Sequence, residues 1–184
     1  MAAKYAKPRI VVSKCLGFAA CRYNGLMISS PFVRKLKDQV DFVPVCPEQE
    51  IGLGVPRDPI RIIETGDRRC LYQPATGRDL TKVMNAFISS FLKALGTVDG
   101  FLLKSGSPSC GIRDVKIYSD TRKRLTNHTT KGRGFFGGRV VKMYPNLAVE
   151  DEARLENAVI KERFLIRVFI DSYQREILKP GPMK

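Results

Sequence analysis

The sequence contains three short apolar runs, each followed closely by a cysteine. The runs are residues 10–12, 42–45 and 101–103, and the cysteines that follow them are Cys15, Cys46 and Cys110. Short apolar runs bounded by turn residues are typical of buried strands. Because the carboxyl ends of parallel strands lie along one edge of a sheet, we expect the three thiols to meet there. Three converging thiols suggest a metal site with one open position.

The segments between the runs predict the rest of the fold. A Ser-Pro pair begins a predicted helix over residues 30–39, and apolar residues at spacings of three and four predict a second helix over residues 79–96. Residues 49–59 are predicted to form an ordered loop, leading to an extended segment at 60–63 and a hairpin near Gly66. This order predicts an α/β fold in a single domain, with a mostly parallel open sheet flanked by helices.

The length of 184 residues is enough for one core of ordinary size. Residues 1–150 are predicted to form the domain that carries the thiol site, and residues 151–184 a C-terminal extension. Within this extension, residues 155–178 are predicted to form an amphipathic helix, with apolar residues at Leu155, Val159, Phe164, Val168 and Phe169. No run of about 18 apolar residues and no apolar signal sequence is present, which predicts a cytoplasmic protein without a membrane partner.

The type and number of cysteines indicate their chemistry. Five cysteines without a compact framework are typical of reduced thiols rather than of disulfides. Three thiolates without a neighbouring histidine disfavour a catalytic zinc site and favour an iron–sulfur cluster. Glu48, two residues after Cys46, is placed to hold or deprotonate a water beside it. Cys21 and Cys70 do not follow strands, so both are predicted to be packing residues, and simple burial remains the alternative for the other three.

The net charge suggests a polyanionic partner. The chain has 32 Lys and Arg against 18 Asp and Glu, a formal net charge of +14, and nucleic acid is the commonest partner of such a chain. The excess is concentrated in residues 113–142, which hold nine basic and two acidic residues. The RNA-contacting candidates in this segment are Arg122, Lys123, Arg124, Lys131 and Arg133. The alternative is a solvated basic face that serves solubility.

Five motifs resemble those of the thiouracil desulfidase family. They are Val12–Gly17, Arg22–Gly25, Pro44–Glu48, Gly52–Arg57 and Leu103–Gly111, and the resemblance covers about residues 8 to 150. It implies a [4Fe-4S] cluster on Cys15, Cys46 and Cys110, with one iron not bound by the protein, and Glu48 and Ser107 as the catalytic pair. Asn24 stands where this family usually has Asp, and Cys21 and Cys70 lie outside the ligand pattern.

The resemblance also implies a reaction. These enzymes replace the thiocarbonyl sulfur of a thiolated pyrimidine with oxygen and release hydrogen sulfide, without net redox change. The chain resembles most the catalytic domain of the two-domain relatives that act on 4-thiouridine in tRNA, and its residues 147–155 and 163–169 look like their junction to the second domain. The charge favours tRNA as substrate, and Arg22, Tyr23 and Ser109 are further substrate-contacting or RNA-contacting candidates.

Three other functions remain open. The first is the desulfidation of free 2-thiouracil or 4-thiouracil, which needs a pocket but few phosphate contacts. The second is a non-enzymatic RNA-binding module in which zinc staples the cysteines. The third is an electron-transfer protein whose cluster has a fourth ligand, for which Cys21 is the best candidate.

Overall fold

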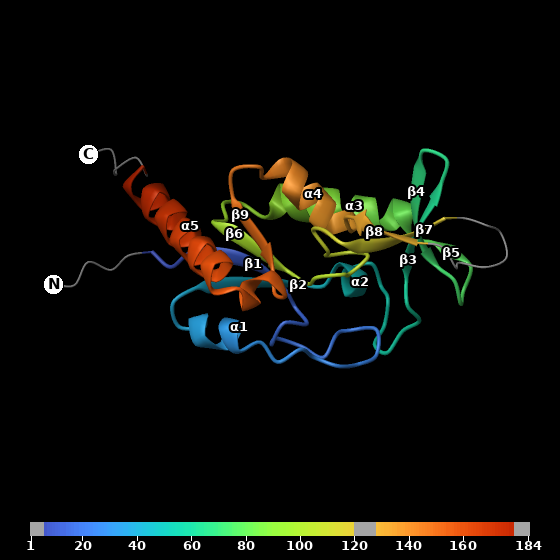
Figure 1. Cartoon of the computed structure of the whole chain (residues 1–184), viewed down its shortest axis with the longest axis horizontal. Helices are drawn as coiled ribbons and strands as arrows, with labels where there is room; N and C mark the ends of the chain where they lie inside the picture. Colours follow the sequence, from blue (N-terminus) through green and yellow to red (C-terminus); the bar gives the residue numbers. More distant parts are fainter. Residues whose placement is uncertain (1–5, 120–127, 179–184) are drawn as a thin grey trace.

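The computed structural model describes residues 6–119 and 128–178, and a parallel sheet lies at its centre (Figure 1). The strand order is β2-β1-β6-β9, and every neighbouring pair is parallel. The strands are β1 (Arg9–Ser13), β2 (Asp41–Val45), β6 (Gly100–Leu103) and β9 (Ala148–Asp151). The first three coincide with the apolar runs that precede the cysteines, which confirms the predicted α/β fold with a parallel sheet.

Helices cover both faces of this sheet, as predicted (Figure 1). They are α1 (Pro31–Leu36), α2 (Pro47–Glu50), α3 (Thr81–Ala94), α4 (Phe135–Met143), a 3₁₀ turn η1 (Arg154–Glu156) and α5 (Ala158–Ile177). Because successive side chains of a strand point to opposite faces, β1 contributes to two cores. Val11 belongs to the core with α3 and α4, whereas Ile10 and Val12 belong to the core with α1 and α5.

The local predictions need three corrections. The first helix ends at Leu36 rather than Gln39, and residues 47–50 form a short helix where a loop was expected from residue 49. The predicted C-terminal helix over residues 155–178 begins only at Ala158, and Leu155 lies in the separate turn η1. In α5, Phe164 and Val168 are buried, whereas Val159 and Phe169 are exposed.

A second sheet of five strands extends the molecule, in the order β5-β4-β3-β7-β8. Its strands are β3 (Arg61–Thr65), β4 (Arg68–Gln73), β5 (Arg78–Asp79), β7 (Val115–Ser119) and β8 (His128–Gly132). The hairpin near Gly66 is confirmed as β3 and β4. The sequence did not predict the parallel pairing of β3 with β7, since it joins Ile62 to Ile117 across a long stretch of chain.

An ion pair fastens α5 to the parallel sheet. Asp99, just before β6, is 2% exposed and accepts hydrogen bonds from Nε and Nη2 of Arg175 at 3.0 and 2.8 Å. It also accepts one from the backbone N–H of Arg9 at 2.7 Å.

The division at residue 150 into domain and extension stays a prediction. Within residues 6–119 and 128–178, no helix is long and apolar enough to cross a membrane.

Candidate functional site

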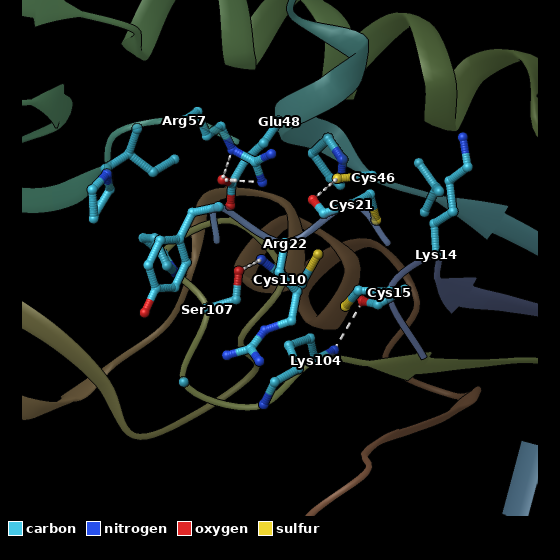
Figure 2. A pocket seen from close by; sticks show the side chains of 18 of the residues that line it. Lys14, Cys15, Cys21, Arg22, Cys46, Glu48, Arg57, Lys104, Ser107 and Cys110 are labelled. Carbon is cyan, nitrogen blue, oxygen red and sulfur yellow. Dashed lines mark hydrogen bonds and ion pairs between the residues drawn. The ribbon is translucent and has the colours of Figure 1, made fainter. Parts of the chain in front are cut away.

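The structure places the three predicted cysteines around one cavity at the carboxyl ends of the parallel strands (Figure 2). The cavity has a volume of about 250 Å³ and is lined by Cys15, Cys46 and Cys110. Cys21 lines it as well. The prediction that Cys21 packs away from this edge is therefore wrong, because the loop after β1 folds back and buries Cys21 beside Cys46.

Backbone hydrogen bonds hold Cys15 and Cys46 at the strand ends. The N–H of Lys14 donates to the carbonyl of Val45 at 2.9 Å, which extends the β1–β2 pairing up to both cysteines. The N–H of Ile28 donates to the carbonyl of Cys15 at 2.9 Å. Cys46 is the N-cap residue of α2, and Pro47 begins that helix. Both thiols therefore project from backbone that is fixed by the sheet.

The loop that carries Cys110 is built on Ser107 and on helix α4. Ser107 Oγ accepts hydrogen bonds from the backbone N–H groups of Ser109 and Cys110 at 3.2 and 3.0 Å, so this hydroxyl stabilises the turn that carries Cys110. The N–H groups at the start of α4 donate to this loop, including Phe136 to the carbonyl of Ser109 at 2.9 Å. A Cβ on Gly137 would overlap the carbonyl oxygens of the loop at Cys110, so a glycine is required there.

Burial makes the thiols reluctant to ionise. It is the largest effect that raises the pKa of Cys15 to about 11, followed by the nearby Cys46, while the charges of Lys104 and Arg22 lower it in part. Burial also raises the pKa of Cys110. Within the described residues, no three Cys, His, Asp or Glu side chains lie close enough to share one metal ion. Three soft sulfur ligands that repel one another as thiolates fit a cationic metal group, which stabilises the ionised form.

Glu48 lies in the same cavity and is held on both oxygens. Arg57 donates to its Oε2 from Nε at 2.9 Å and forms an ion pair from Nη2 at 2.8 Å. Ser109 Oγ donates to its Oε1 at 3.0 Å. Ser109 was predicted to contact substrate or RNA, but its side chain is 0% exposed and positions Glu48 instead. Arg57 belongs to one of the five motifs of the sequence, but its contact with Glu48 was not predicted.

Arg22 and Tyr23 line the cavity, as expected for residues that contact substrate. The guanidinium carbon of Arg22 lies 5.9 Å from the centre of the Tyr23 ring. The N–H of Arg57 donates to the carbonyl of Tyr23 at 2.8 Å, so the residue that holds Glu48 also fixes the loop that presents Tyr23. Lys14 and Lys104 line the cavity too, and the sequence analysis missed both.

Glu152 was also missed, and it fixes Lys104. Its carboxylate forms an ion pair with Lys104 Nζ and accepts hydrogen bonds from the N–H and Oγ of Ser105, each at 2.7 Å. Burial acts to raise the pKa of Glu152, but the bonds from Lys104 and Ser105 outweigh it and lower the pKa. Glu152 follows β9 as the cysteines follow their strands. The apolar residues 147–149 could have indicated that strand, but the sequence analysis interpreted them as a domain junction.

The structure describes the side chain of one of the five RNA-contacting candidates in residues 113–142. Arg122, Lys123 and Arg124 lie outside the described residues. Lys131 belongs to β8, and Arg133 is exposed just before α4 without lining the cavity. The contribution of this basic segment to RNA binding remains a prediction.

The chain matches one family model, a protein of Bacillus subtilis and one solved structure. The profile of the family described as 2-thiouracil desulfurase matches residues 10–152. The chain is 37% identical over 127 residues to the uncharacterized protein YbbK of Bacillus subtilis (strain 168), which covers 64% of this chain and 82% of that protein. A solved structure of the [4Fe-4S]-dependent thiouracil desulfidase TudS is similar with a TM-score of 0.61 and 28% identity, covering 85% of this chain and 99% of that one.

Two neighbouring glycines of α4 give a test of how the Cys110 loop is supported. In Gly137→Ala, the new Cβ overlaps the loop backbone, and overpacking of this kind lowers the free energy of unfolding by about 1–3 kcal/mol. Gly138→Ala is the matched control, since its Cβ contacts only the Cβ of Arg133, and we expect a change of no more than about 1 kcal/mol. Urea unfolding measures both changes. Equal stability of the two variants would contradict this account of the loop.

Proposed function

The chain belongs to the 2-thiouracil desulfurase family, and from this membership we propose that it replaces the thiocarbonyl sulfur of a thiolated pyrimidine with oxygen. One water is consumed and one hydrogen sulfide is released, so no electrons are gained or lost. The observation that carries the proposal is the single cavity in which Cys15, Cys46 and Cys110 meet the carboxylate of Glu48 (Figure 2).

We propose that Cys15, Cys46 and Cys110 hold a [4Fe-4S] cluster; the similar TudS protein is described by its name as [4Fe-4S]-dependent. The donor set supports this, because all three thiols are buried and soft, and Lys104 and Arg22 favour the ionised form of Cys15. With three protein ligands, such a cluster supplies one iron that has no protein ligand and acts as a Lewis acid with affinity for sulfur.

Glu48 is proposed as the general base. Each of its oxygens already accepts from a neighbour, Oε2 from Arg57 and Oε1 from Ser109. A carboxylate has about four lone-pair sites, so it retains the capacity to hold a water in the cavity. Glu48 then accepts a proton from that water as the water oxygen approaches the ring carbon. Arg57 and Ser109 fix the direction from which the water approaches.

Ser107 is proposed as the hydrogen-bond donor to the pyrimidine. Its oxygen accepts from two backbone N–H groups, of Ser109 and Cys110, and these occupy both of its lone pairs. The hydroxyl hydrogen is then the only part of the group left for a ligand. Ser107 can therefore donate to the ring but cannot accept from it, and the donation stabilises charge that develops on the ring during attack.

The substrate is proposed to be 4-thiouridine in tRNA, with free 2-thiouracil or 4-thiouracil as the alternative. Tyr23 is 44% exposed at the cavity and offers a ring for stacking on a base. Arg22 and Lys14 form no ion pair with any described residue and can meet phosphate groups. The net charge of +14 supports a polyanionic substrate.

The first experiment measures metal content and sulfide release on the same preparation. After anaerobic reconstitution, we expect about four irons and four acid-labile sulfides per chain, as a [4Fe-4S] cluster requires. The loaded protein is expected to release hydrogen sulfide from thiolated tRNA or thiouracil, and Cys15→Ser is expected to lose both the iron and the reaction. Zinc without labile sulfide would instead support the RNA-binding module.

Removal of the base tests the role of Glu48. We expect Glu48→Gln to retain its iron while kcat for sulfide release falls about 10²- to 10⁴-fold, the range that general base catalysis contributes. Glu50→Gln is the control, because Glu50 is exposed on the same short helix and does not line the cavity. A Glu48→Gln variant with the kcat of the wild type would exclude Glu48 as the base.

The salt dependence of the reaction distinguishes the two substrates. If tRNA is held by about four phosphate contacts, its apparent affinity is expected to fall about 100-fold between about 50 and 200 mM salt. Turnover of free thiouracil is expected to change little over the same range. Steady-state kinetics at several salt concentrations measure both, and a salt-insensitive KM for tRNA would contradict the tRNA proposal.

A further inference from the structure

Four cysteines line the cavity, and the proposed cluster uses three of them. The fourth, Cys21, is 1% exposed. The thiol of Cys46 donates to the backbone carbonyl of Cys21, with Sγ and oxygen 3.9 Å apart (Figure 2). The side chains of Cys21 and Cys46 line the same cavity. Cys21 is therefore in direct contact with one of the proposed ligands.

This contact argues against Cys21 as a fourth cluster ligand. Cysteines that bind different irons of one cluster stand across an edge of the cubane, whereas Cys46 Sγ lies against the backbone of Cys21 itself. The loop that carries Cys21 is tied in place, since the N–H of Cys21 donates to the carbonyl of Ala19 and the carbonyl of Cys15 accepts from Ile28, both at 2.9 Å. Two cysteines that are in contact on fixed backbone and line one cavity are better placed to bond to each other.

We propose that Cys21 and Cys46 form a reversible disulfide when the cavity is free of its cluster, with a peroxide as the oxidant. The assignment of Cys46 as a ligand rests on the function proposed above, whereas the contact between Cys46 and Cys21 does not. The disulfide removes Cys46 from the ligand set, so the oxidised chain cannot take up a cluster until a thiol reductant opens the bond.

The proposed oxidation proceeds in two steps. The sulfur of Cys46, which at 9% exposed is the more accessible of the two, attacks one oxygen of hydrogen peroxide. The O–O bond breaks, and a sulfenic acid on Cys46 and one water form. The sulfur of Cys21 then attacks the Cys46 sulfur, the S–O bond breaks, and the second water leaves. The two thiols together lose two electrons and two protons, and the peroxide is reduced to two waters.

The position of Cys21 has a consequence for Cys46. Capture of the sulfenic acid by Cys21 prevents further oxidation of Cys46 to a sulfinic acid, which thiol reductants do not reverse.

Peptide mapping of the whole chain tests the proposal. The cluster-free protein is treated anaerobically with one equivalent of hydrogen peroxide, alkylated, digested and analysed by mass spectrometry. We expect it to lose two of its five thiols and to yield a peptide in which Cys21 is joined to Cys46. After dithiothreitol, all five thiols and the full capacity to bind iron should return. A link between other cysteines, or no link at all, would overturn the proposal.

Two variants separate this role from simple packing. Cys70→Ser is the control, since Cys70 lies in β4 away from the cavity, and it should form the link as the wild type does. In Cys21→Ser treated with at least two equivalents of hydrogen peroxide, one for each oxidation step, Cys46 is expected to reach the sulfinic acid, so most of the iron capacity is lost and dithiothreitol does not restore it. Full recovery in this variant would overturn the protective role. Thiol counts and mapping do not depend on desulfidase activity, so failure of the proposed reaction would leave this test valid.

Discussion

The site depends on one constraint: three cysteine side chains share a small buried space, in which their ionised thiolates would repel one another. The parallel sheet satisfies the geometric part, because the carboxyl ends of β1, β2 and β6 bring Cys15, Cys46 and Cys110 to one edge. It does not satisfy the electrostatic part, as the raised pKa values of Cys15 and Cys110 show. The cavity is therefore stable with neutral thiols or with thiolates bound to a cationic group, but not with free thiolates.

Two carboxylate–cation pairs border these thiols, and each organises a different part of the cavity. The pair of Glu48 and Arg57 orients a carboxylate, while the pair of Lys104 and Glu152 orients an ammonium group. In both pairs, the carboxylate also accepts a hydrogen bond from a serine: Glu48 from Ser109, and Glu152 from Ser105. Removal of one partner from such a buried pair is strongly destabilising, because it leaves an uncompensated charge. The intact pair adds little net stability, so we infer that its main role is to orient the charged group in the cavity.

The parallel sheet and its cysteines were predictable because each strand and each ligand is local in sequence. A short apolar run identifies β1, β2 and β6, and the cysteine that follows each run needs no knowledge of distant residues. The contacts of the site were less predictable, since they join residues far apart: Ser109 with Glu48, and Glu152 with Lys104. Ser109 was predicted to contact substrate, because the packing of α4 that buries it is not visible in the local sequence. The position of Cys21 was missed for a similar reason, since the fold of a loop returns it to the cavity.

The cavity also limits how a nucleobase within RNA could react. A base must leave its stack to reach a buried site, at a cost of a few kcal/mol. Stacking on one aromatic ring such as Tyr23 contributes about 1–3 kcal/mol, which roughly offsets that cost but leaves little net affinity. Among the described residues, four cations line the cavity, and two of them, Arg57 and Lys104, are already paired with carboxylates. Of these four, Arg22 and Lys14 are left for phosphate. A tRNA substrate therefore requires phosphate contacts outside the cavity, whereas a free base requires none.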